Sequence, residues 1–203
     1  RMDGEKMSKS LGNFFTIREV LAKYRPEVVR YLLISSHYRS PINYSEDSLQ
    51  GAQAALERFY AALRDFGAVA PADAATLAAS AHHARFVAAM DEDFNTPEAL
   101  AVLFDLAREL NAAARSEPAL ALRLAAELKG FGAIFGILAE DPTLFRRGGE
   151  AGEEDSQIEA LVEARNAAKK ARDFARADAI RAELAERGVV LEDTRQGTVW
   201  RRA

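Results

Sequence analysis

Residues 4–13, GEKMSKSLGN, hold the side chains that are best suited to chemistry in this sequence. Lys6 and Lys9 stand three residues apart, beside Ser8 and Ser10 and between flanking glycines. A lysine ammonium is a mobile point charge on a long stem, and serine hydroxyls can donate to phosphate oxygens. Cations that meet a phosphate best in the transition state raise the rate of reaction. An isolated pair of lysines is usually only a solvated basic loop, but that alternative must account for the whole ten-residue string.

The remaining titratable residues offer little sign of a metal site. The chain has no cysteine, which excludes disulfides and thiolate ligands within it, and three histidines are too few for a convincing cluster. We expect His82 and His83 to lie on the surface of an acidic helix, and we assign no role to His37. The carboxylates of residues 91–93 precede a helix, where they complement its dipole or fill a loop.

Composition and charge describe an ordinary globular chain with unevenly distributed charge. Of its 203 residues 49% are hydrophobic and 29% charged, which excludes a collagen-like or largely disordered protein, and the lack of a long apolar run excludes a membrane span. Residues 1–44 carry eight Lys and Arg against four Asp and Glu, residues 45–155 nine against nineteen, and residues 156–203 ten against eight. A polyanion would prefer the two ends, although solvated acidic helix faces would also explain the middle.

Two short helices are expected to follow the lysine loop and position it. Thr16 with Glu19 three residues later forms a capping box that opens a helix to about Tyr24. Pro26 suits the first turn of the next helix, which runs to about Ser36, and the stretch HYRSPINYS then forms a loop.

The middle of the chain predicts four antiparallel amphipathic helices. Ser45 caps a long helix, a second covers residues 74–90, and the third begins with Asn95 or Thr96 as its cap. Pro118 starts the fourth. Amphipathic helices joined by short loops are typical of a bundle.

The end of the chain predicts a small module after a linker. Residues 139–155 are polar and contain glycines, as in a linker. A helix from Ser156 to about Arg172 and another capped by Asp173 precede the runs VVLED and TVWRR, which predict a hairpin with a loop of about four residues. The fold is therefore expected to be mainly α, with parts at residues 1–44, 45–138, 139–155 and 156–203.

The strings of this sequence resemble one enzyme family in four separate places. KMSKS is the signature loop of class I aminoacyl-tRNA synthetases. The longer string GEKMSKSLGNFFTIREVL, followed by VVRYLLISSHYRSPINYSEDSL, resembles the cysteinyl-tRNA synthetases. FVAAMDEDFNTPEALAVLFDLARELN and RDFARADAIRAELAERGVVLEDTRQGTVWRR are similar to later parts of the same family, in the same order.

The resemblance implies an enzyme that activates cysteine with ATP and Mg and transfers it to its cognate tRNA(Cys). Lys9 would be the usual ATP contact, and Lys6 would stabilise charge on the departing pyrophosphate. Residues 1–44 would end the catalytic domain and contact the acceptor stem, the bundle would be a DALR-type anticodon-binding domain, and the tail would read the anticodon. The family's nucleotide-binding half, with its HIGH motif and its zinc, precedes KMSKS and is not in this sequence. We therefore expect this chain to be inactive alone. We expect the parent enzyme to be a cytoplasmic monomer that does not bind a membrane and that binds its zinc in the other half.

Sequence-specific RNA readers stack unpaired bases on flat side chains and hydrogen-bond their edges. Phe174 and Trp200 are the flat side chains of the tail, although each could instead pack in the core, and the core is the favoured place for Trp200. Asp193 at the hairpin turn is the strongest candidate for reading a base. The other candidates for tRNA contact are Asp178 and Glu192 as acceptors and Lys169, Lys170, Arg172, Arg201 and Arg202 as phosphate contacts.

Two other functions fit parts of the sequence. The first alternative is a stand-alone, non-catalytic tRNA-binding helical protein. The second is a helical interaction module that uses the apolar faces of the bundle. A pure binder has no need of an ATP-contacting loop, which favours the ligase.

Overall fold

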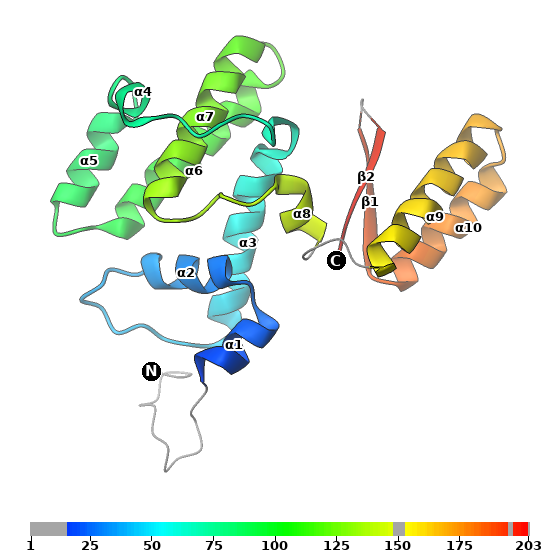
Figure 1. The fold of residues 1–203 in the computed structure, drawn as a ribbon, viewed down its shortest axis with the longest axis horizontal. Helices are drawn as coiled ribbons and strands as arrows, with labels where there is room; N and C mark the ends of the chain where they lie inside the picture. Colours follow the sequence, from blue (N-terminus) through cyan, green and yellow to red (C-terminus); the bar gives the residue numbers. More distant parts are fainter. Residues whose placement is uncertain (1–15, 148–152, 195–196, 203) are drawn as a thin grey trace. The chain divides into compact units, whose positions relative to one another are not determined.

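Helices dominate the computed structural model, which describes residues 16–147, 153–194 and 197–202 (Figure 1). The chain divides into two compact units, residues 1–140 and 141–203. This confirms the mainly α fold with a C-terminal hairpin. None of the helices in the described ranges has the length and apolar character that crossing a bilayer requires.

The first two helices begin where their caps predict. Thr16 opens α1 (Ile17–Lys23): its hydroxyl accepts from the Glu19 N–H at 3.3 Å, and the Glu19 carboxylate accepts from the Thr16 N–H at 2.6 Å. These reciprocal bonds satisfy donors that every helix start leaves free. Pro26 is the first residue of α2 (Pro26–Ile34), which ends two residues before the expected Ser36.

The bundle packs around α6 (Thr96–Ala113), which is capped by Asn95 and lies against α3 (Glu46–Ala62), α5 (His83–Asp91) and α7 (Pro118–Ile134) (Figure 1). A 3₁₀ turn, η2 (Arg64–Phe66), and the short α4 (Ala74–Ala78) connect α3 to α5. Apolar side chains at helical spacing meet in one core. Its fully buried members include Leu49, Leu56, Phe59, Leu103, Leu106, Leu110 and Leu128.

The single helix expected over residues 74–90 is wrong, because a turn separates α4 from α5. The Ser80 hydroxyl accepts from the His82 N–H at 3.2 Å and donates to the Glu127 carboxylate at 2.6 Å. A serine that bonds its own backbone in this way competes with the helical pattern.

His82 is also not a surface residue, contrary to expectation. It is 6% exposed, its Nε2 lies 3.1 Å from Glu109, and its Nδ1 lies 4.0 Å from Glu127 on α7. The ring faces the carboxylates of Glu109 on α6 and Glu127 on α7, and these two partners lie far from it in the sequence.

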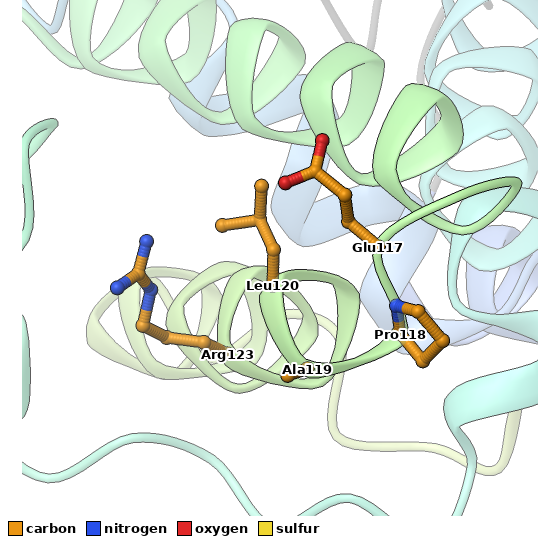
Figure 2. A pocket seen from close by; sticks show the side chains of 5 residues that line it. All are labelled: Glu117, Pro118, Ala119, Leu120 and Arg123. Atoms are coloured by element: carbon orange, nitrogen blue, oxygen red, sulfur yellow. The ribbon is translucent and has the colours of Figure 1, made fainter.

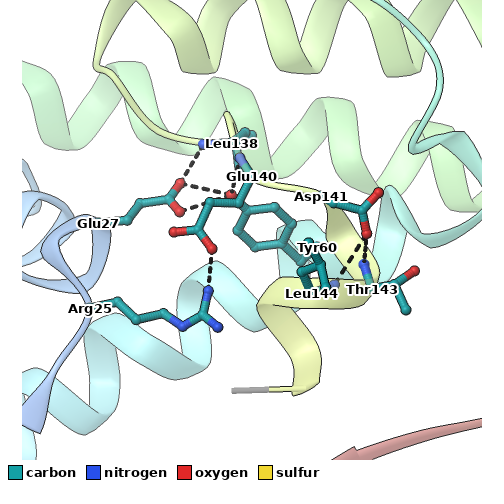
Figure 3. A network of polar contacts seen from close by, with 8 residues as sticks. All are labelled: Arg25, Glu27, Tyr60, Leu138, Glu140, Asp141, Thr143 and Leu144. Carbon is teal, nitrogen blue, oxygen red and sulfur yellow. Dashed lines mark hydrogen bonds and ion pairs between the residues drawn. The ribbon is translucent and has the colours of Figure 1, made fainter. Parts of the chain in front are cut away.

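A buried polar network ties α2 to α3 and to the segment after α7 (Figure 3). The Tyr60 hydroxyl on α3 donates to both oxygens of Glu27 on α2, at 2.8 and 3.1 Å, and accepts from the Glu140 N–H at 3.2 Å. The Leu138 N–H also donates to Glu27, and Arg25 pairs with Glu140. The network therefore holds α2 against α3 and against the segment that follows α7.

Within residues 141–147, 153–194 and 197–202, the second unit shows three helices and the hairpin. They are α8 (Pro142–Arg147), α9 (Glu153–Lys170), α10 (Phe174–Glu186), β1 (Val189–Thr194) and β2 (Gly197–Arg202). The antiparallel register pairs Thr194 with Gly197, so two residues separate the strands rather than the expected four. A helix, α8, occupies part of the expected linker. Ile158, Val162, Ile180, Leu184, Val189 and Trp200 form the core.

Candidate nucleic-acid interface

The proposed ATP loop lies outside the described residues. Lys6, Ser8, Lys9 and Ser10 all belong to it, so their roles stay predictions. The described chain starts at Thr16, whose capping box sets the direction of α1 directly after the loop.

The turn between α9 and α10 has three basic residues within five positions of an exposed aromatic residue. Lys169 and Lys170 end α9, Arg172 follows in a left-handed conformation at φ 60°, and Phe174 is the first residue of α10. Asp173 caps α10 by accepting from the Arg176 N–H at 3.1 Å. The Phe174 side chain is 61% exposed, which rules out its packing between the two helices. A flat ring among cations suits a base and its phosphates.

Asp193 lies beside that turn, one residue pair inside the hairpin rather than at its tip. The Arg165 guanidinium of α9 donates two hydrogen bonds of 3.1 Å to the Asp193 carboxylate, and the Lys169 ammonium donates a third of 2.9 Å. Thr198, its partner across the hairpin, donates at 2.7 Å. Bonds from Arg165 first, then from Thr198 and Lys169, hold the pKa of Asp193 well below its ordinary value. Its side chain remains 50% exposed, so an ionised carboxylate faces solvent there.

Trp200 does not join this surface. It is 4% exposed and packs with Ile158, Val162 and Leu184, so its ring is unavailable to a base and its candidate role in tRNA stacking is wrong. The side chain points inward because period-two alternation places it opposite Leu191 on the helix-facing side of the hairpin.

The other tail candidates are more scattered. Asp178 is exposed on α10. Arg201 is half-buried and its Nε lies 3.3 Å from the Glu192 carboxylate across the hairpin. The side chain of Arg202 lies outside the described part of the structure. The tRNA roles of these three residues stay predictions.

Sequence reasoning missed a cluster on the first unit that joins the loop after α2 to the loop before α6. Asp93 accepts from the Tyr38 hydroxyl at 2.6 Å and from Arg39, whose Nε lies 2.9 Å away. His37 stacks on Tyr38 with ring centroids 4.9 Å apart. Asp93 and Phe94 both have φ near 55°, which is unusual for non-glycine residues. Nothing in the sequence near Asp93 indicates its partners, which lie 55 positions away.

A pocket of about 590 Å³ opens at the start of α7, where Glu117, Pro118, Leu120 and Arg123 line it (Figure 2). Glu117 and Arg123 bring charges of opposite sign to an otherwise apolar lining, which gives the pocket no clear preference for an anion or a cation. We assign it no ligand.

Both units match known protein families. The profile described as tRNA synthetases class I (C) catalytic domain matches residues 1–54, the DALR domain matches residues 85–139, and the cysteinyl-tRNA ligase anticodon binding domain matches residues 151–201. The whole chain is 58% identical to the cysteine–tRNA ligase of Thioalkalivibrio sulfidiphilus over 203 residues. Identity is 57% over 99% of the chain for the enzyme named so in Azotobacter vinelandii, and 59% over 98% for that of Chromohalobacter salexigens.

Over its whole length the chain is similar to cysteine–tRNA ligases. It spans 43% of the length of each of these three relatives. The position of the matches on the fold is informative, because the anticodon binding domain of the family covers α9, α10 and both strands, which carry Phe174 and Asp193.

The described residues do not fit the zinc site that the resemblance implies for the family. No group of three His, Asp or Glu side chains within residues 16–147, 153–194 and 197–202 is placed to hold a metal ion, and the chain contains no cysteine.

Proposed function

We propose that this chain is the tRNA-binding, C-terminal portion of a ligase that activates cysteine with ATP and transfers it to tRNA(Cys). The observation that carries the proposal is identity of 58% across the whole chain to a cysteine–tRNA ligase. Cysteine's carboxylate attacks the α-phosphate of ATP, which forms cysteinyl-adenylate and releases pyrophosphate. A ribose hydroxyl at the 3′ end of the tRNA then attacks the cysteinyl carbonyl, which forms the ester and releases AMP.

The lysine loop and the tail would have separate parts in this reaction. Lys9 contacts ATP and Lys6 stabilises the charge on the departing pyrophosphate, with Ser8 and Ser10 donating to phosphate oxygens. ATP enters with Mg. The part that binds cysteine would lie in the rest of the parent enzyme, so this chain alone does not form the adenylate. Cysteine-dependent exchange of pyrophosphate into ATP by the isolated chain would contradict this.

The tail would read the anticodon loop. In this proposal Phe174 stacks on a base, and Lys169, Lys170 and Arg172 meet the phosphates around it. Support comes from the exposure of the ring and from the cations that end α9 next to it. Asp193 would accept from a base amino or imino group, and its place beside Lys169 supports this.

Binding of a fluorescent tRNA(Cys) transcript to the 203-residue chain tests the function. Wild type should bind, and transcripts with a changed anticodon should bind more weakly. Phe174→Ala should weaken binding about tenfold, since a base–aromatic stack is worth roughly 1–3 kcal/mol. Phe174→Leu keeps the apolar volume without a flat π face, so it should weaken binding nearly as much. Equal affinity for every anticodon would count against the assignment.

The role of Asp193 requires the parent ligase. Asp193→Asn keeps the shape of the side chain and leaves Arg165 an acceptor, so the fold should survive. We expect slower charging of tRNA(Cys) and unchanged pyrophosphate exchange. An equal loss in both assays would mean that Asp193 supports the structure rather than reading the RNA.

A further inference from the structure

We propose that a groove between α3 and α6 receives an unpaired nucleotide of the bound tRNA, with its base on Phe104 and its phosphate between Arg58 and Arg108. The inference rests on the proposed function, because it names a second place where the same RNA is held. The groove belongs to the unit of residues 1–140, whereas the anticodon-reading candidates belong to α9, α10 and the hairpin of the other unit.

The shape of the groove suits a flat ligand. Its volume is about 630 Å³, within the range of small-molecule sites. Ala61 of α3 and Ala101 and Ala107 of α6 line it, so the side chains where the two helices approach are the smallest that a helix carries apart from glycine. A larger residue at Ala61 or Ala101, both of which are exposed, would fill the space.

Phe104 provides an anchored ring at the wall of the groove. It stacks on the fully buried Phe59 with centroids 4.3 Å apart and an interplanar angle of 24°. Phe104 itself is only half-buried. A planar base laid against its accessible part would extend an existing pair of rings, and the ring would lose little freedom because Phe59 already holds it.

The charges on the rim favour a nucleotide over an apolar protein segment. Arg58 and Arg108 come from opposite helices, and the Asn111 amide adds a donor and an acceptor that suit a base edge. Asp105 is the acidic member of the lining, and Arg85 of α5 pairs with it at 2.8 Å in addition to Arg108. The arginines near the groove therefore outnumber its carboxylate, although residues 45–155 as a whole are strongly acidic.

The experiment measures the affinity of the 203-residue chain for tRNA(Cys), with variants that fill the groove. Ala101→Trp adds a ring to the α6 side of the groove, and Ala61→Trp adds one to the α3 side. Each should weaken binding about tenfold by displacing the base. The control Ala84→Trp adds the same ring to an exposed position on α5 outside the groove and should leave affinity unchanged. Thermal unfolding of each variant shows whether it keeps its fold.

A second pair of variants tests the phosphate contact. Arg58→Gln should weaken binding and lower the slope of log affinity against log salt by about 0.7–0.9, the loss of one phosphate contact. Arg115→Gln removes an exposed arginine just beyond α6 and should not change that slope.

The outcomes separate this inference from the proposed function. If wild type binds and Phe174→Ala weakens binding while both groove-filling variants bind like wild type, the groove is not an RNA site and the inference falls alone. If the wild-type chain does not bind tRNA(Cys), both fall. If free adenosine monophosphate protects the groove but filling it leaves tRNA affinity unchanged, the site takes a free nucleotide and the inference is overturned.

Discussion

At the scale of single residues, burial disfavours ionisation of the Glu27 carboxyl group. It is 5% exposed, and burial raises its pKa above the ordinary value of 4.5 even though Leu138 and Tyr60 donate to it. The same environment raises the pKa of the Tyr60 hydroxyl, first through burial and then through the charge of Glu27. The protonation state of Glu27 therefore affects how firmly α2 is held against the bundle.

The pH dependence of stability should reveal this carboxyl group. Because its pKa in the folded chain is raised, its contribution is fully present below the unfolded value of about 4.5 and is lost as pH rises through the folded value. Glu27→Gln cannot ionise, so the free energy of unfolding of wild type should fall relative to that of the variant as pH rises above 4.5. Urea unfolding of both proteins at a series of pH values measures this. A constant difference between them would show that Glu27 does not titrate abnormally.

Two glycines within helices differ in the space around them: one has room for a side chain and the other does not. Gly51 lies inside α3, and a Cβ added there would meet nothing within 4 Å. Gly130 lies inside α7, where a Cβ would come within 2.8 Å of the Ala72 carbonyl oxygen and 3.0 Å of Leu77. The Ala72 N–H also donates to the Ala126 carbonyl of α7 at 2.8 Å, so the close approach of this loop is fixed by the backbone.

Alanine at each position should therefore change stability in opposite directions. Gly51→Ala should raise the free energy of unfolding by about 0.5–1 kcal/mol, because alanine favours helix. Gly130→Ala should lower it by about 1–3 kcal/mol, because backbone atoms of the loop must move. Chemical denaturation of the two variants is the measurement. A stabilising Gly130→Ala would mean that the loop is free to move away from α7.

At the scale of the whole molecule, the chain has two separate cores, and its single tryptophan belongs to one of them. Trp200 packs in the core of the second unit with Leu184, whereas Leu106 is fully buried in the bundle. Tryptophan fluorescence therefore reports on the unit of residues 141–203.

A core substitution in either unit should affect that unit first. Leu184→Ala should lower the denaturant midpoint seen by tryptophan fluorescence, since such truncations cost about 2–5 kcal/mol. Leu106→Ala should lower the midpoint seen by circular dichroism more than the midpoint seen by fluorescence. Coincident shifts of both probes in both variants would show that the chain unfolds as one cooperative block.

The helix caps and most of the elements could be predicted from the sequence because they depend on residues close together in the chain. The bonds from Thr16 to Glu19, from Ser45 to Ser48 and from Asp173 to Arg176 each span three positions. The lysine loop and the family strings are likewise contiguous, so they indicated a cysteinyl-tRNA synthetase without knowledge of the fold.

Only the tertiary structure decided which side chains meet across distant parts of the chain. Lys129 is buried and donates to the carbonyls of Phe66, Gly67 and Val69, about 60 positions earlier, although nothing near it in the sequence suggests this. Residues far apart in the sequence likewise form the contacts of His82, the ion pairs of Asp193 and the groove beside Phe104. Local pattern determined most of the helices and the resemblance to the family, but not the break between α4 and α5. Packing between helices depends on the positions of all of them at once, and it determined which polar groups are buried and which surfaces stay exposed.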